Sequence, residues 1–279
     1  MLRLPCLILL LATFLPAASG NAAPLTVDEI MERAMAPRGG KDMLARLDFL
    51  IEAGTERKRF VLLMAYKREG GKPGAGARLI MFNDFPPHAR DVSFLARLHP
   101  PASGKKDEMW LYLPQLRSIR KLSHRHEHGH HPEKNEDDFA LSVLQRFELQ
   151  PRDPGLDKHV LLEETELDGQ PVYRIASTPR DARTSPYARI VFWITHDDHL
   201  PVRLDYLDAG RQVVKRQTLR WQRRGDAWVW QEVEATDLLT GHRTRLRLRD
   251  VKVNTGLSDN LFSKRFMRRG AGALQARLR

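Results

Sequence analysis

Hydrophobic and polar residues alternate over much of the chain beyond residue 58, in short runs separated by turn-forming residues such as Asp168-Gly169. This period of two is typical of strands that bury one face, and the turn composition is typical of hairpins. The pattern predicts an antiparallel meander of about eleven strands in a large curved sheet or barrel. We expect strands in the runs Arg59–Lys67, Arg78–Phe82, Val92–Leu98, Met109–Leu113, Ser118–Leu122, Val160–Leu167, Val172–Ser177, Arg189–Thr195, Val202–Leu207, Val213–Trp221, Trp228–Thr236 and Arg243–Val253.

Three segments show features of helices. Thr26 and Glu29 have the spacing of a capping box, which predicts a helix near 26–36 that ends before Pro37. A second short helix is expected within 41–51. A central helix is expected over 133–147, because its apolar residues recur at helical spacing. We find no linker that would divide the chain, so 24–279 is expected to form one α+β domain, mainly antiparallel β.

The first 23 residues have the pattern of a secretory signal peptide. Arg3 precedes an apolar run from Leu4 to Leu15, and small residues follow. The run is too short to span a bilayer, although an N-terminal membrane anchor is the alternative. Cys6, the only cysteine, lies inside this run. We therefore expect a periplasmic protein that is secreted through a cleaved signal peptide and whose mature part has no cysteine.

The positive charge is concentrated near the C-terminus. The chain has 46 basic and 35 acidic residues, and residues 200–279 hold 18 basic against 8 acidic ones. Export makes nucleic acid an improbable partner for this charge. Alternation places four arginines on one face of a strand, with a bulge expected near Asp250. They form either a docking face for an acidic or anionic surface or a solvated strand face: Arg243, Arg245, Arg247 and Arg249.

A histidine-rich stretch covers 124–131. His126, His128 and His130 are candidate ligands for weak zinc or copper binding, and a solvated loop is the alternative. The spacing of His126 and His130 formally matches the zinc protease motif, but Gly129 and Pro132 argue against the helix that this motif requires. No other catalytic motif is found, so we expect a protein that is not an enzyme.

The segment Met109–Leu122 carries the sequence MWLYLPQLRSIRKL, which resembles the WLYLP…R signature of the LolA-like family of outer membrane lipoprotein-sorting proteins. Weaker matches to that family follow the same order along the chain: Val92–Leu95, Pro201–Tyr206 and Leu257–Phe262. A departure lies before the central helix, where residues 135–138 replace the Gly-Ser-Asp of the family.

The resemblance implies a strongly curved, half-open β-barrel whose concave face is covered by helices and whose apolar cavity holds acyl chains. Family members are periplasmic carriers or adaptors for lipids and lipoproteins, some associated with transporters of the resistance-nodulation-division (RND) type. The expected function is therefore a non-catalytic carrier or adaptor for a lipid or lipoprotein acyl chain. The expected partners are that ligand and an RND-type transporter or an anionic membrane surface.

Six apolar side chains are candidates for lining this cavity, although membership of an ordinary core is the simpler explanation for any one of them: Phe94, Trp110, Tyr112, Leu144, Phe192 and Trp193. Two other functions remain open. One is a metal-binding adaptor that uses the histidine-rich loop. The other is an envelope-stress sensor that detects lipoproteins through the same barrel.

Overall fold

The computed structural model describes residues 24–36, 38–71, 76–100, 103–122, 142–144, 146–149 and 152–278. The predicted signal peptide and the histidine-rich loop lie outside these residues.

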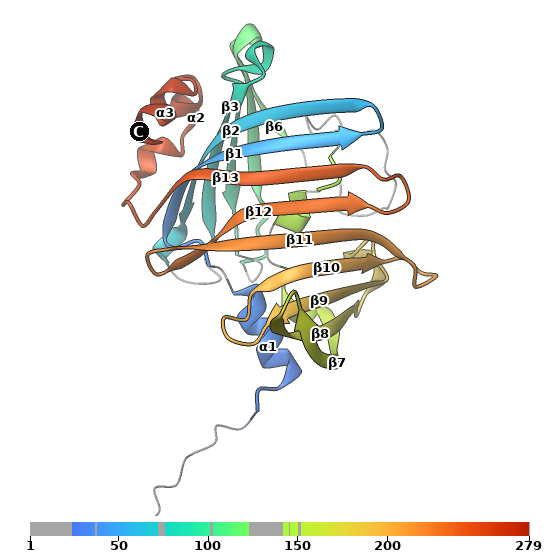
Figure 1. Cartoon of the computed structure of the whole chain (residues 1–279). Coiled ribbons are helices and arrows are strands. Elements are labelled where there is room, and N and C mark those ends of the chain that lie inside the picture. Colours follow the sequence, from blue (N-terminus) through green and yellow to red (C-terminus); the bar gives the residue numbers. More distant parts are fainter. Residues whose placement is uncertain are drawn as a thin grey trace, which may run out of the picture.

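One curved antiparallel sheet forms most of the molecule (Figure 1). It has thirteen strands in the described part of the chain, more than the eleven or so expected. The prediction of a mainly antiparallel β fold is confirmed. The strands are β1 (Asp42–Ala53), β2 (Glu56–Arg68), β3 (Ala77–Phe85), β4 (Ser93–Leu98), β5 (Glu108–Leu113), β6 (Ser118–Leu122), β7 (Asp157–Leu167), β8 (Gln170–Pro179), β9 (Arg189–Thr195), β10 (Pro201–Leu207), β11 (Val213–Arg224), β12 (Ala227–Asp237) and β13 (Arg243–Val253).

The strand order is β6-β5-β4-β3-β2-β1-β13-β12-β11-β10-β9-β8-β7, which describes two meanders joined side by side. The first meander runs from β1 outward to β6, and the second returns from β7 to β13. Antiparallel pairing of β1 with β13 joins them in the middle of the sheet. The two edges are therefore β6 and β7, and the chain must pass from one edge to the other between residues 122 and 157.

The turns and irregularities of the sheet follow from local sequence. Asp168 and Gly169 both adopt positive φ, at 52° and 79°, as the hairpin turn between β7 and β8 requires. The expected bulge near Asp250 is confirmed. Asp250 has φ 52°, and the β1–β13 register shifts between the Leu44–Lys252 and Arg46–Arg249 pairs.

The two faces of the sheet carry different residues. The inner face, as we call it, bears the cross-strand pairs Phe49–Leu246, Leu246–Val233 and Phe192–Leu204. The outer face bears Leu44, Leu63 and Ile80 at one end and a ladder of charged residues in the middle. Burial of apolar side chains on both faces at β1 and β2 stabilises the centre of the sheet.

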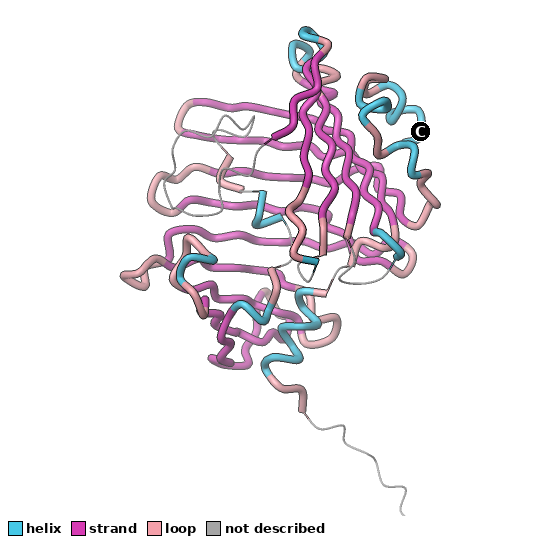
Figure 2. Tube along the Cα trace, turned by 180° about the vertical axis from the view of Figure 1, so that it is seen from behind, coloured by secondary structure: helices cyan, strands magenta, loops and turns pink. Residues whose placement is uncertain are grey.

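Helix α1 (Val27–Met35) packs against the inner face of the second meander (Figure 2). The predicted capping box is confirmed, since the Thr26 hydroxyl accepts a hydrogen bond from Glu29 N at 3.3 Å and the Glu29 carboxylate accepts one from Thr26 N at 2.7 Å. Ile30 and Met31 are fully buried against Ile175 and Phe192 of that face. No helix of the described residues is long and apolar enough to cross a membrane.

Two short helices at the C-terminal end, α2 (Lys264–Met267) and α3 (Gly272–Leu278), cover the outer face of the first meander. The segment that leads to them is hydrogen-bonded to Asp42 at the start of β1, whose side chain is buried. Its carboxylate accepts hydrogen bonds from Thr255 N at 2.8 Å, Thr255 Oγ1 at 3.0 Å, Gly256 N at 2.9 Å and Leu257 N at 3.1 Å. This cluster fixes the chain at the point where it leaves β13 for α2.

The structure differs from the sequence at two expected helices. The prediction of a helix within 41–51 is wrong, because Asp42–Ala53 forms β1. Its alternation is hidden because Leu44 is buried on the outer face while Leu47 and Phe49 are buried on the inner face. Most of the predicted helix 133–147 lies outside the described residues, but its end is not α-helical: 142–144 form a bend and Arg146–Leu149 a 3-10 turn.

Candidate functional site

The six predicted cavity residues do not lie on one face. Phe94 and Phe192 lie on the inner face, and Leu144 packs onto it from the connector between the two meanders. Trp110 and Tyr112 lie on the outer face with the core beneath α2 and α3. Trp193 is also on the outer face, with the guanidinium of Arg203 4.2 Å from its ring centre. Only Phe94, Phe192 and Leu144 share the side of the sheet that an internal ligand would use.

A row of half-buried apolar side chains crosses the inner face of the first meander. The register pairs Met64 with Met81, Met81 with Phe94, and Phe94 with Leu111, so these four side chains lie next to one another on β2 to β5. We call them the apolar row. Each is only partly buried, whereas Ile175 and Ile194 beneath α1 are 0% exposed. The apolar row is therefore one part of the inner face that α1 does not cover.

A short strap lies on the inner face beside this row. It consists of residues 142–144 and 146–149, on the path from β6 to β7. Leu144 is 4% exposed and packs with Leu246 and Leu219. The backbone N–H of Val143 donates to Thr244 Oγ1 of β13 at 2.8 Å. Both apolar and polar contacts thus fix the strap to the centre of the sheet.

A buried ion pair holds the strap to β11. The Lys215 ammonium donates to the Glu148 carboxylate and to the Val143 carbonyl, with side-chain exposures of 6% for Lys215 and 1% for Glu148. The Tyr187 hydroxyl donates to Glu148 at 2.9 Å. Burial lowers the pKa of Lys215, although the Glu148 carboxylate opposes that shift. Burial also raises the pKa of the Tyr206 hydroxyl, whose ring lies 5.4 Å from the Lys215 nitrogen.

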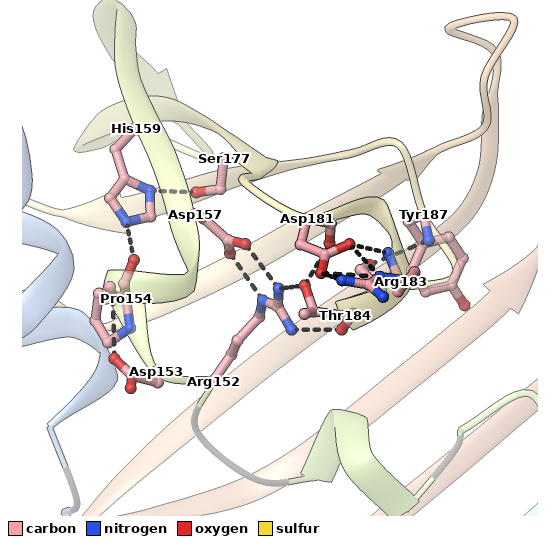
Figure 3. Close-up of polar contacts among 12 residues, drawn as sticks. Arg152, Asp153, Pro154, Asp157, His159, Ser177, Asp181, Arg183, Thr184 and Tyr187 are labelled. Carbon is pink, nitrogen blue, oxygen red and sulfur yellow. Dashed lines mark hydrogen bonds and ion pairs between the residues drawn. The ribbon is translucent and has the colours of Figure 1, made fainter. Parts of the chain in front are cut away.

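The return of the chain into edge strand β7 is fixed by a second polar cluster (Figure 3). Arg152 donates two hydrogen bonds to Asp157, at 2.8 and 2.7 Å, and one to the Thr184 carbonyl at 2.9 Å. Asp157 is 3% exposed, so this bidentate pair replaces solvent around the carboxylate. The connector is therefore held at the strap and again where β7 begins.

His159 and Ser177 in the same cluster have the spacing of a base and a nucleophile, with 2.8 Å between Nδ1 and Oγ (Figure 3). The other ring nitrogen lies 3.0 Å from the Pro154 carbonyl, which can only accept. Ser177 is 1% exposed, so no substrate reaches its hydroxyl. We interpret the pair as structural.

The four arginines of the predicted docking face lie together on the outer face, on β13. Carboxylates on the neighbouring strands contact all of them. Arg245 pairs with Glu234 at 2.9 Å, Arg243 approaches Glu234 at 3.6 Å, and Arg249 approaches Asp48 at 3.7 Å. Arg247 pairs with Glu232. Much of the positive charge that the sequence places here is therefore neutralised within the sheet.

Asp205 of β10 also belongs to the charged residues of the outer face, and its ion pairs predict a pH dependence of the protein's stability. Burial alone raises the pKa of Asp205, but hydrogen bonds from Arg216 at 2.8 Å and Arg203 at 2.8 Å outweigh burial and hold it below its usual range. The ion pairs therefore stabilise the fold above the unfolded pKa of about 4 and lose this effect as the pH falls through the folded value.

Replacing Asp205 by asparagine is expected to lower the free energy of unfolding by about 1–2 kcal/mol at pH 7. The difference from the wild type should shrink below about pH 4, because the wild-type carboxyl then becomes neutral as well. Urea unfolding at pH 7 and pH 3 measures both values. An equal difference at the two pH values would contradict the assignment.

Metal binding by His126, His128 and His130 stays a prediction, because these residues lie outside the described ranges. Within those ranges no group of three or more histidine, cysteine, aspartate or glutamate residues could hold a metal ion.

Comparison with known proteins identifies the fold. A family model described as "Uncharacterized protein" matches residues 76–269. The chain belongs to this family, and its fold is LolA-like. The comparison with curated proteins gives no match.

Three solved structures support this assignment of the fold. A domain from Vibrio parahaemolyticus described as an outer membrane lipoprotein-sorting protein is 23% identical, with a TM-score of 0.68, and the match covers 86% of this chain and 97% of that one. A DUF1329 family protein from Desulfovibrio piger is 20% identical, with a TM-score of 0.69 and coverages of 86% and 96%. A LolA superfamily protein from Nitrosomonas europaea is 14% identical, with a TM-score of 0.59 and coverages of 87% and 100%.

Sequence reasoning found Phe94 and Leu144 but missed the rest of the apolar row and the Lys215–Glu148 pair. One signal was present. Lys215 and Gln217 share the strand phase of Leu219, so a charged residue occupies an apolar position of a predicted strand. Such a residue is rarely buried unless it is paired. Its partner, 67 residues away, is visible only in the fold.

Proposed function

We propose that this protein is a non-catalytic periplasmic carrier or adaptor that binds a lipid or lipoprotein acyl chain along the apolar row. The observation that carries the proposal is the row itself, four adjacent half-buried apolar side chains on the inner face of a LolA-like sheet. An acyl chain laid across Met64, Met81, Phe94 and Leu111 would gain about 0.8 kcal/mol for each methylene group that it buries. Binding of this kind needs no reactive group.

The strap would form one wall of this site. Val143, Leu144 and Leu149 pack in the same inner core as Met64 and Met81. The Lys215–Glu148 pair, which holds the strap to β11, would support this wall. We propose an RND-type transporter or an anionic membrane surface as the partner that supplies or receives the ligand.

Two leucine variants test the proposal. Leu111 lies in the apolar row, whereas Leu116 is 60% exposed outside it. Leu111→Glu should reduce the lipid recovered with the protein at least about tenfold, because the carboxylate would be desolvated beside the acyl chain. Leu116→Glu makes the same chemical change and should leave recovery unchanged. The measurement is mass spectrometry of organic extracts from protein purified without detergent, after incubation with anionic phospholipid.

Circular dichroism of both variants establishes that they are folded. Wild-type protein that recovers no lipid would overturn the proposal. So would a folded Leu111→Glu variant that recovers as much lipid as Leu116→Glu.

A further inference from the structure

The C-terminal helices carry positive charge that no carboxylate of the described residues neutralises, apart from Asp259. Residues 254–278 contain five basic residues and a single acid, Asp259. Asp259 is already paired with Lys67 of β2 at 2.7 Å and approaches Arg78 of β3 at 3.6 Å. The arginines of β13 meet carboxylates on the neighbouring strands β12 and β1, whereas the arginines of α2 and α3 have no such pairing among the described residues.

Three of these arginines converge on one pocket of about 400 Å³. Arg265 comes from α2, Arg269 follows α2, and Arg277 comes from α3. All three are exposed, and none forms an ion pair with any residue that the structure describes. The wall also contains Ser258 and Asn260, which offer hydrogen-bonding groups, and the apolar side chains of Leu261 and Phe266.

The pocket is built on a fixed frame. Asp42 holds the chain at residues 255–257, before α2. Asp91 accepts a hydrogen bond from Ala271 N at 2.6 Å, between α2 and α3. Phe266 and Met267 are buried in the outer core beneath. The three arginines therefore extend from a rigid unit and not from a loose tail.

We propose that this pocket binds the phosphate of an anionic phospholipid headgroup at a membrane surface. Guanidinium groups match phosphate oxygens with paired hydrogen bonds, and three of them around one pocket favour an anion and disfavour a cation. Lys264 and Arg268 belong to the same segment and are also exposed, so they add positive charge to this part of the molecule. The proposal concerns the headgroup and the outer face. It extends the proposed function but uses none of the apolar row, so either can fail alone.

The test compares two triple variants with the same change of net charge. Arg265→Gln/Arg269→Gln/Arg277→Gln removes the pocket charge. Arg120→Gln/Arg180→Gln/Arg224→Gln removes three exposed charges elsewhere. Binding is measured by co-sedimentation with vesicles of phosphatidylglycerol and phosphatidylcholine, and with vesicles of phosphatidylcholine alone. Since each basic residue at an anionic surface contributes about a fivefold gain in affinity, the pocket variant should bind the anionic vesicles about 100-fold more weakly. The control variant should bind like the wild type.

Several outcomes would overturn the proposal. Equal losses in the two variants would show a general charge effect without a site. Wild-type binding to phosphatidylcholine vesicles alone at the same affinity would show that the anionic headgroup is not recognised. Calorimetric binding of inorganic phosphate without binding to anionic vesicles would assign the pocket to a soluble ligand. Thermal unfolding of both variants at the wild-type temperature keeps a loss of binding distinct from misfolding. Lipid recovery in the Leu111→Glu experiment reports on the apolar row separately.

Discussion

Replacing Lys215 by methionine is expected to lower the free energy of unfolding by about 3–5 kcal/mol. Methionine keeps most of the aliphatic volume, but the Glu148 carboxylate, 1% exposed, then loses the charge that compensates its burial. The Val143 carbonyl also loses its donor. A buried charge without its partner is among the most destabilising changes known in folded proteins. Urea unfolding monitored by fluorescence measures the difference.

Two further variants make this prediction specific. Lys58→Met removes an exposed lysine whose pairing with Glu56 is solvated, and it should cost less than about 1 kcal/mol. The double variant Lys215→Met/Glu148→Gln removes both charges and should recover a substantial part of the loss, because no lone buried charge remains. A double variant less stable than Lys215→Met would contradict our interpretation of the pair.

Replacing Asp42 by alanine is expected to cost about 3–5 kcal/mol and to loosen α2 and α3 from the sheet. The substitution leaves the backbone N–H groups of residues 255–257 without the carboxylate that accepts their hydrogen bonds. The outer core beneath the helices, including Leu63, Ile80 and Phe82, would become accessible to water. Urea unfolding gives the free energy, and binding of an apolar dye reports the exposed core.

Asp226→Ala is the matched control. Asp226 is exposed and accepts one hydrogen bond, from Asn254 Nδ2 at 2.9 Å, close to the same segment. It should cost less than about 1 kcal/mol and should not increase dye binding. If Asp42→Ala behaved like this control, the Asp42 carboxylate would not be what holds the C-terminal helices.

The sheet could be predicted from the sequence where one face of a strand meets solvent. Each of the twelve predicted runs falls within a strand of the structure or overlaps one closely, and Thr26 caps α1 as its capping box predicts. The prediction failed at β1, where side chains are buried on both faces and alternation disappears. The short helices α2 and α3 were not predicted, since four and seven residues are too few to show a helical period.

The candidate site was less predictable for a geometric reason. The sequence shows which residues of a strand share a face, but it does not show which face is the inner one. Trp110 and Tyr112 share a phase, and the structure places both on the outer face with the core beneath α2 and α3. Met109 and Leu111, their neighbours in the same motif, point the other way. The net charge of the outer face could not be predicted either. The arginines of β13 lie opposite carboxylates on β12 and β1, and only the strand register shows that they do.

The seam between β1 and β13 has a consequence for how the chain acquires its structure. Each meander is assembled from neighbouring hairpins, which close short loops and form quickly. The seam instead joins strands far apart in sequence, and Asp42 at the start of β1 is 213 residues from Thr255, just beyond the end of β13, to which it is hydrogen-bonded. In a chain that is synthesised or exported from its N-terminus, the edge of β1 that pairs with β13 must therefore stay unpaired until β13 is available. Because an unpaired strand edge promotes association between chains, this interval is when the protein is most exposed to aggregation.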